Sequence, residues 1–411
     1  MRAVLCAVVL LLACTRNPGG GGTERATAPL EPTTRDSAGV TIHEHPGDAL
    51  DRAPLIAFDD APLAVFAGTA DSEEGDVSAL TQMRFTRAGD LVGFDRSEQQ
   101  LVVLPVGGSP WRRFGRKGAG PGEIGRYGEL VVLAGDTLAF RDGPNARIAV
   151  ISPREGILRE RALTGRRSGS LLGRVTSGEY VMQSFAVGGI TPDPQSGPLH
   201  QPVEIRTWRG GEDSVISRFI AGQVAMWREF RTIDGGTAMA MYGAELSVEP
   251  QLAIWGDAVA ISPGPEWRIE RRDLSGSLMS VVRIDRLPTQ LTDSMWAAHV
   301  DTSVAEWVRR DTLANVAEVR ERIAARRQDL DVAVIQELVV TPNQVAWLID
   351  YQHAGHDGWA ATAFDQDGRI LGRIEEAAGD PPMAIGTDRM AFRTEDDLGI
   401  ATITVRRLVM P

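Results

Sequence analysis

Short apolar segments alternate with tight polar turns along most of the chain. In the clearest example, apolar residues 130–133 precede a turn at Gly135 and Asp136, and further apolar segments follow at 137–142 and 147–151. Apolar runs of this length, bounded by glycine and aspartate turns, are typical of β-strands joined as hairpins. Five more units in the same order begin near residues 83, 171, 252, 338 and 383.

The units recur at intervals that suit the blades of a β-propeller. Strand–turn–strand repeats spaced roughly 40–50 residues apart are typical of such blades. A blade cannot bury both of its faces alone, so the units must stack around an axis. We therefore predict an all-β fold, a six-bladed β-propeller over residues 37–411, with a pair of β-sandwiches as the alternative. We also predict that the strand at 40–45 closes the ring beside the C-terminal strand at 400–406, which removes exposed sheet edges.

Residues 292–330 depart from the strand pattern. Val304, Trp307 and Val308 lie at helical spacing, and a second apolar stripe follows them. This predicts a helical insert before the fifth blade. The stripe either packs on the propeller or belongs to a lid over one mouth of the central channel, or to a partner-binding face. Trp296 and Trp307 are the candidate contact residues for a lid or partner face, because aromatic anchors are over-represented at recognition sites.

The chain begins like an export signal. Arg2 precedes an apolar run that ends in Leu-Leu-Ala-Cys at Cys14. The run is too short to span a membrane, which takes about 20 residues. This ending resembles the lipobox of bacterial lipoproteins, which implies cleavage before the cysteine and acylation of Cys14. We expect a signal peptide at 1–13 and a lipid-anchored protein of the cell envelope. The threonine after Cys14, where the family's retention pattern has aspartate, implies the outer rather than the inner membrane.

Residues 14–36 are rich in Gly, Pro, Thr and Ala and show no periodicity, which predicts a flexible tether. The net charge of −12 and the pI near 5.1 argue against a nucleic-acid partner, whose phosphates need a basic surface. The two cysteines are Cys6, which leaves with the signal, and Cys14, which would carry lipid. The mature fold would then contain no disulfide, cysteine nucleophile or thiolate metal site.

A glycine-rich segment at 114–123 reads Phe-Gly-Arg-Lys-Gly-Ala-Gly-Pro-Gly-Glu. It resembles a segment in a six-bladed β-propeller family of bacterial envelope proteins akin to NHL-repeat proteins. That resemblance implies the fold and no single shared activity. The segment lacks the Gly-Lys-Ser/Thr of a phosphate-binding loop, and no helix opens after it. We therefore expect Gly118, Gly120 and Gly122 to form a connection between blades that needs positive φ angles.

Two sets of polar residues are candidate metal ligands. His353, His356 and Asp357 lie between two predicted strands and could bind Zn²⁺ if the loop folded back, although we favour a polar hairpin loop there. The second set comprises aspartates that end the second strand of three blades: Asp95, Asp142 and Asp350. Some propeller lactonases hold Ca²⁺ at the axis with carboxylates, so these positions could form a ring. We favour the other interpretation, in which each aspartate binds its own turn backbone.

The sequence shows no Ser/His/Asp set and no close carboxylate pair of the glycosidase kind. The leading prediction is a non-catalytic binding module that takes a protein, glycan or small ligand at a channel mouth, without a cofactor or a tightly bound transition metal. The alternative is a hydrolase or lyase with an axial metal site, for which Ca²⁺ is the ion to consider. Three carboxylate or histidine side chains converging on the axis would favour the enzyme. The membrane, through lipid on Cys14, is the other predicted partner.

Overall fold

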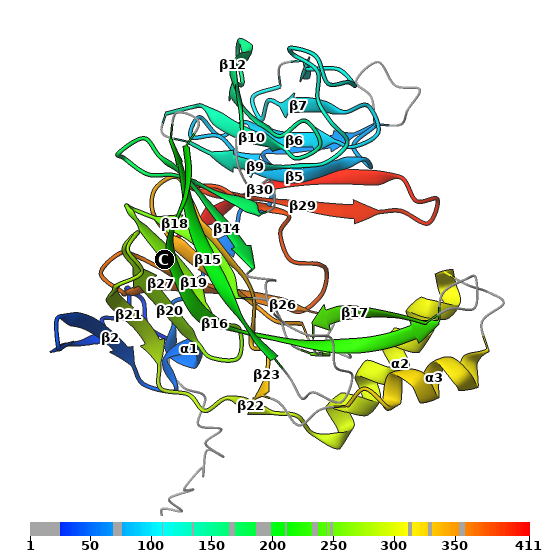
Figure 1. The fold of residues 1–411 in the computed structure, drawn as a ribbon. Coiled ribbons are helices and arrows are strands. Elements are labelled where there is room, and N and C mark those ends of the chain that lie inside the picture. Colours follow the sequence, from blue (N-terminus) through cyan, green and yellow to red (C-terminus); the bar gives the residue numbers. More distant parts are fainter. Residues whose placement is uncertain are drawn as a thin grey trace, which may run out of the picture.

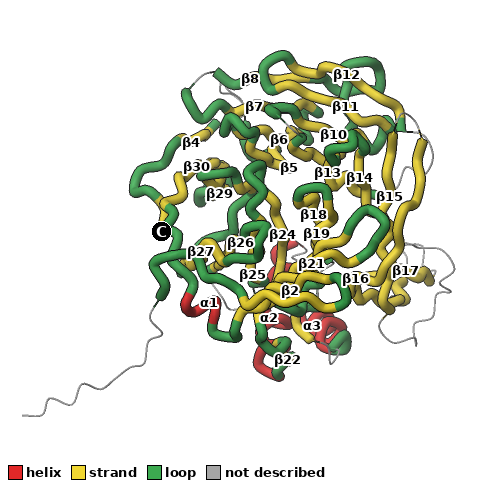
Figure 2. The backbone as a smooth tube through the Cα atoms, turned by 90° about the vertical axis from the view of Figure 1, so that its left-hand side faces the viewer, coloured by secondary structure: helices red, strands yellow, loops and turns green. Residues whose placement is uncertain are grey.

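The computed structural model describes most of the chain. The described residues are 25–68, 76–108, 110–133, 135–163, 169–185, 199–209, 212–231, 237–243, 245–246, 250–310, 315–327, 331–352 and 358–411. Six sheets of four to six strands stand around a ring, and Figure 2 looks onto its face. This confirms the prediction of an all-β, six-bladed propeller.

We number the blades in chain order of their inner strands. Blade one contains β5 (Leu80–Phe85), β6 (Leu91–Asp95), β7 (Gln100–Leu104) and β8 (Arg112–Phe114). Blade two contains β9 (Gly128–Val132), β10 (Leu138–Asp142), β11 (Arg147–Ser152) and β12 (Gly156–Ala162). Blade three contains β13 (Ser170–Arg174), β14 (Tyr180–Phe185), β15 (Leu199–Arg209), β16 (Glu212–Arg231) and β17 (Thr237–Gly243).

Two of the last three blades, blades four and six, recruit strands from the N-terminal part of the chain. Blade four contains β18 (Gln251–Trp255), β19 (Ala258–Ser262), β20 (Arg268–Arg272) and β21 (Leu278–Ile284), extended by β2 (Val40–His45) and β1 (Thr33–Ser37). Blade five contains β24 (Ile335–Val340), β25 (Ala346–Asp350), β26 (Trp359–Phe364) and β27 (Ile370–Glu376). Blade six contains β28 (Ala384–Ile385), β29 (Arg389–Glu395) and β30 (Ala401–Val409), joined by β3 (Ala57–Phe58) and β4 (Ala64–Ala67).

Apolar packing between neighbouring blades holds the ring together. Every residue of β6, β10 and β19 is buried, because a second strand is covered on both faces by the adjacent blades. This burial explains why the second segments are mostly apolar runs instead of alternating apolar and polar residues. Between blades one and two, for example, the rings of Phe94 and Phe140 lie 5.0 Å apart in one apolar cluster. The core therefore consists of successive layers between blades rather than one central mass.

The predicted closure of the ring is wrong. The segment at 40–45, which is β2, pairs in parallel with β21 of blade four. Blade six is instead completed by β4, which pairs antiparallel with β30. Both N-terminal segments are short strands, and any exposed sheet edge can accept one. Local alternation therefore cannot decide which edge each strand joins.

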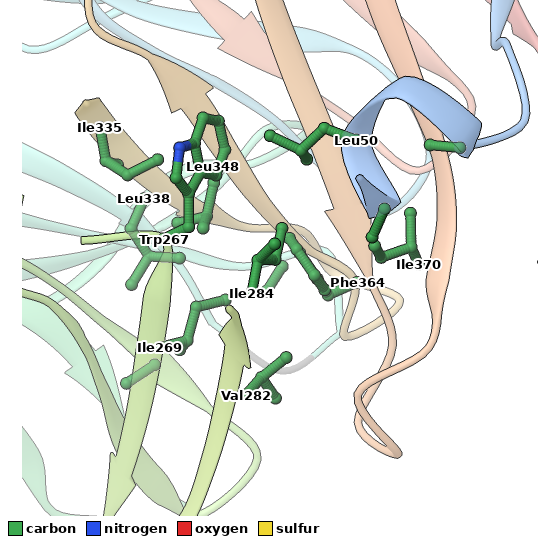
Figure 3. Close-up of a cluster of buried hydrophobic side chains, with 14 of the residues drawn as sticks. Leu50, Trp267, Ile269, Val282, Ile284, Ile335, Leu338, Leu348, Phe364 and Ile370 are labelled. Carbon is green, nitrogen blue, oxygen red and sulfur yellow. The ribbon is translucent and has the colours of Figure 1, made fainter. Parts of the chain in front are cut away.

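Residues 25–67, which we call the N-terminal belt, pass along the outer edges of blades four, five and six. After Leu30, which exchanges backbone hydrogen bonds of 2.9 and 3.0 Å with Ile370, the belt forms β1 and β2. The short helix α1 (Ala49–Arg52) then buries Leu50 against a cluster that includes Phe364 and Ile370 (Figure 3). The predicted tether at 14–36 overlaps this paired segment, so its boundary at residue 36 is too late. Residues 1–24, with the predicted signal and Cys14, lie outside the described residues.

His45 fastens the belt to blade five. Its side chain is 1% exposed, and Nε2 donates to the carbonyl oxygen of Gly368 at 2.7 Å. Within the described structure, its Nδ1 is buried without a hydrogen-bond partner. Burial lowers the pKa of His45 below the ordinary value of 6.5, an effect that the Gly368 carbonyl opposes. The folded protein therefore favours the neutral imidazole.

We expect stability to fall as the pH drops below 6.5, because the unfolded chain binds the His45 proton more readily than the folded one. Above that pH the imidazole is neutral in both the folded and the unfolded state, so it does not change the dependence of stability on pH. Replacing His45→Gln keeps a donor for the Gly368 carbonyl and removes the titration. Melting temperatures measured between about pH 5 and pH 8 should therefore decline less steeply in the variant than in the wild type. Equal slopes would show that His45 does not titrate on unfolding.

The helical insert lies between β21 and β24, which confirms its predicted place before blade five. It consists of α2 (Asp293–Arg310) and α3 (Val316–Ala324), flanked by the paired strands β22 (Thr289–Gln290) and β23 (Asp331–Val332). The side chain of Asn315 caps α3 by accepting from the amides of Ala317 and Glu318. Figure 1 shows both helices at the lower right of the view, beside the ends of β16 and β17.

Candidate functional site

The inner strands of all six blades enclose a cavity of about 900 Å³, which we call the axial cavity. It lies toward the end of the ring where each inner strand turns into the second strand of its blade. This volume falls within the range of about 300–1,000 Å³ that is usual for small-molecule sites. Its apolar wall comes from every blade and includes Phe85, Val131, Leu172, Ile254, Val340 and Ile385.

The rim of the axial cavity is formed by the turns between first and second strands, and side chains join these turns across the blades. Asp136 accepts a hydrogen bond from the amide of Ala88 in the preceding blade at 2.8 Å. Asp257 accepts in the same way from Thr176 at 2.9 Å, and hydrogen bonds from Thr176 lower the pKa of this aspartate. The side-chain oxygen of Gln344 continues the pattern between blades five and four. The rim is therefore formed before any ligand arrives.

Six charged residues line the cavity in addition to its apolar wall. Four are arginines and two are acids: Arg84, Arg87, Arg159, Arg174, Asp257 and Glu337. Arg84 and Glu337 lie on the inner strands of blades one and five and are both half-buried. Burial lowers the pKa of Arg84, and the charge of Glu337 opposes that shift. Burial likewise raises the pKa of Glu337, against the effect of Arg84.

Three of these charged residues follow irregularities in the inner strands. The pairing of β5 with β6 shifts between Thr81 and Arg84, and Gln82 in the interruption has φ = 53°. Similar shifts occur in β13, just before Arg174, and in β24, just before Glu337. A bulge re-aims the side chains that follow it and is over-represented next to functional sites. A non-glycine residue at positive φ costs of order 1–3 kcal/mol, which the surrounding structure must offset.

Two of the predicted aspartates bind their own turns, which confirms the favoured interpretation for them. Oδ1 of Asp95 accepts from the backbone amides of Ser97 and Glu98 at 2.9 and 3.0 Å. Asp142 is 1% exposed and accepts from the amide of Asn145 at 3.3 Å. Both turns join second and third strands, so they lie at the end of the ring opposite the rim of the axial cavity.

Each predicted aspartate also pairs with an arginine of its own blade. The partners are Arg113 for Asp95, Arg147 for Asp142 and Arg373 for Asp350. Burial raises the pKa of Asp350, and the guanidinium of Arg373 opposes the shift. Within the part of the chain that the structure describes, no three His, Cys, Asp or Glu side chains come together as a metal site. The other predicted ligands, His353, His356 and Asp357, lie outside the described residues.

The glycine-rich segment connects β8 to β9, which matches its predicted role between blades. Gly122 has φ = 71° and Gly118 has φ = 150°, both in the region that favours glycine, but Gly120 does not have a positive φ, so the prediction is wrong for that residue. The amides of Gly118, Gly120 and Gly122 donate to Ile124, Glu123 and Glu160, at 2.7 to 3.2 Å. Because these amides already have protein acceptors, the segment does not offer them to a phosphate.

The two tryptophans of the insert differ in exposure. Trp296 is 7% exposed and packs with Val300, Val319 and other residues between α2 and α3. It therefore contributes to the core of the insert and cannot be a contact residue on its surface. Trp307 is 41% exposed, and the guanidinium of Arg322 lies 5.0 Å from its ring centre. None of the described insert residues lines the axial cavity, so a lid at the opposite mouth stays a prediction.

Sequence reasoning missed the charged wall of the axial cavity. Arg84 and Glu337 are each the one charged residue of a first strand, in Met-Arg-Phe and Gln-Glu-Leu. A single charged residue in a strand that should be buried was the available signal.

Among the described residues, no helix is both long and apolar enough to cross a membrane.

The fold and cavity define a six-bladed β-propeller with a ligand-sized site on its axis. No protein-family model and no curated protein matches this chain. Solved structures do resemble it, such as a member of the DUF4221 family from Bacteroides vulgatus, at 9% identity and a TM-score of 0.49 over 87% of this chain and 100% of that one. Virginiamycin B lyase from Staphylococcus aureus is 10% identical, with a TM-score of 0.39 over 86% of this chain and 100% of the lyase. Identities this low say nothing about activity.

Proposed function

We propose that this protein is a non-catalytic binding protein of the bacterial cell envelope that takes a small ligand into its axial cavity. The observation that carries the proposal is the cavity of about 900 Å³, to which all six blades contribute. An apolar wall with a few placed charges is the usual composition of a small-molecule site. The hydrogen-bonded rim also supports the proposal, since a preformed mouth reduces the entropy lost on binding.

Filling the axial cavity should abolish ligand binding. Leu172 lines the cavity from blade three, and Leu172→Trp would occupy part of its volume. Leu398→Trp is the matched control, because Leu398 is 83% exposed in the turn between β29 and β30. After incubation with the small-molecule fraction of an envelope extract, native mass spectrometry should show a ligand adduct on the wild type and control only. An adduct that survives in Leu172→Trp, or the absence of any adduct on the wild type, would contradict the proposal.

The envelope location rests on the signal-like N-terminus. Replacing Cys14→Ala removes the thiol that acylation requires, so the variant should leave the membrane fraction and become soluble. Several acyl chains on one cysteine anchor firmly, at about 0.8 kcal/mol for each buried CH₂, so we expect the shift to be nearly complete. Fractionation followed by immunoblotting measures it, with Thr15→Ala as the control for a neighbouring change. A Cys14→Ala variant that stays in the membrane fraction would exclude the lipid anchor.

One observation favours a second function, a hydrolase or lyase. Glu337 lies in the axial cavity with a pKa raised by burial, which suits a general acid or base. Such an enzyme would convert the captured ligand, so the adduct on the wild type should change in mass with time, whereas Glu337→Gln should retain the unchanged adduct. A constant adduct on both proteins would favour the binding function.

A further inference from the structure

We infer that the axial cavity selects a ligand with an apolar body and an anionic group, which Arg84 and Arg174 hold from blades one and three. The inference deepens the proposed binding function and rests on it. A carboxylate and a sulfonate or phosphate ester share the required chemistry, since arginine binds each of them through paired, charge-assisted hydrogen bonds.

The charge of the cavity is opposite to that of the protein. The whole chain carries 43 basic and 55 acidic residues. The cavity wall, in contrast, has four arginines and only the acids Asp257 and Glu337. Asp257 is already engaged, because its carboxylate accepts the amide of Thr176 in the rim. A basic cavity in an acidic protein is therefore a local feature of the site, and it would attract anions.

Two of the cavity arginines keep most of their hydrogen-bonding capacity for a ligand. Arg87 donates to the carbonyl of Pro342 at 3.4 Å, and Nε of Arg174 donates to the carbonyl of Gly178 at 2.8 Å. Carbonyl acceptors leave the positive charge uncompensated, and a guanidinium has five N–H donors in all. Neither arginine has an ion-pair partner among the residues that the structure describes. Both are exposed at the mouth, where an anionic group would enter.

Arg84 is more buried than Arg87 and Arg174, and the irregular strand before it fixes its position. Arg84 follows the bulge at Gln82 and Met83. Gly93 on the neighbouring strand β6 leaves room for the Met83 side chain, because a Cβ atom on residue 93 would lie 2.2 Å from the methionine sulfur. The strained bulge thus buries Met83 and presents Arg84 to the cavity. Burial lowers the pKa of Arg84, whereas the negative charge of Glu337, the nearby acid, raises it. Arg84 itself donates to the carbonyl of Met83 at 2.7 Å, which leaves most of its five N–H donors for an anion.

Three probes with one ring system and different charge test this inference: naphthylacetate, naphthylacetamide and naphthylethylamine. Isothermal titration calorimetry on the full-length chain at low salt should give the lowest Kd for the anion. A hydrogen bond to a charged group contributes about 1.5–3 kcal/mol. Arg84→Gln should therefore raise the Kd of naphthylacetate more than about tenfold and the Kd of the neutral amide less than about threefold. Arg84→Lys should recover part of the loss.

Two further variants keep the test decisive if Arg84→Gln is unstable. Arg174→Gln changes an exposed residue of the same cavity and should weaken the anion selectively as well. Arg126→Gln is the matched control, because Arg126 is exposed before β9, at the end of the ring opposite the rim. Melting curves show that each variant is folded. Preference for the amide or the amine, or unchanged anion binding in both Arg84→Gln and Arg174→Gln, would overturn the inference and leave the binding function intact. Binding of none of the three probes would count against both.

Discussion

Replacing Asp142→Ala should lower the free energy of unfolding by about 3–5 kcal/mol, which is the usual cost of removing one partner from a buried ion pair. Oδ2 of Asp142 accepts from the amide of Gly125 at 3.1 Å, from Nδ2 of Asn145 at 2.7 Å and from Nε of Arg147 at 3.3 Å. Arg147 is only 9% exposed and also holds the carbonyl of Gly120 in the glycine-rich segment. The variant would leave Glu160, 3.3 Å away, as the carboxylate partner of this guanidinium and would release the connection between blades one and two.

Asp396 provides a matched control for that prediction. It occupies the corresponding turn of blade six and accepts the amides of Leu398 and Ile400 at 2.9 and 2.8 Å. Asp396 is exposed, and no buried arginine depends on it in the described structure. Asp396→Ala should therefore cost about 1 kcal/mol or less. Urea unfolding followed by tryptophan fluorescence measures the free energy of unfolding of both variants. Equal losses would mean that the buried hydrogen bonds of Asp142 stabilise the protein no more than those of an exposed turn.

Replacing Phe66→Ala should destabilise the protein by about 3–5 kcal/mol, as expected for a buried aromatic residue. Phe66 lies on β4, is 7% exposed, and packs edge-on against Trp111 of blade one at 6.2 Å between ring centres. The same apolar cluster contains Ile403 of blade six and Leu91 of blade one. The side chain thus fills the seam at which the last blade meets the first.

Val65 on the same strand is 55% exposed, so Val65→Ala should change stability by no more than about 0.5 kcal/mol. Thermal unfolding should show one cooperative transition in the wild type and a markedly lower melting temperature for Phe66→Ala. If Phe66→Ala melts like Val65→Ala, the seam does not contribute to the stability of the ring.

The repeated part of this fold was predictable because each blade meets the same physical demand. A second strand covered on both faces must be mostly apolar, and a tight turn to it favours glycine and aspartate, as at Gly135 and Asp136. The binding of Asp95 to its turn was open to prediction for the same reason, since the hydrogen bonds span only a few residues. The helical insert was predictable from its change of period.

Long-range features were not predictable from local pattern. Strands β2 and β4 are both short, and only the completed ring shows that the first extends blade four and the second closes blade six. Arg84 and Glu337 are far apart in the chain and reach one cavity only because the blades form a circle. Trp296 could not be distinguished from an exposed aromatic residue until α2 and α3 were seen to pack together.

The N-terminal belt sets an order on the assembly of the molecule. Residues 25–67 are synthesised before any of the six inner strands, yet their partners β21, β27 and β30 are among the later parts of the chain to be synthesised. Contacts of such high sequence separation form slowly, because the loop must close before any contact stabilises it. The belt must therefore wait unpaired while the first three blades emerge, and the outer edges of blades four to six stay open until it docks. Exposed strand edges are prone to misassociation, so this interval is when a nascent chain of this protein most needs protection.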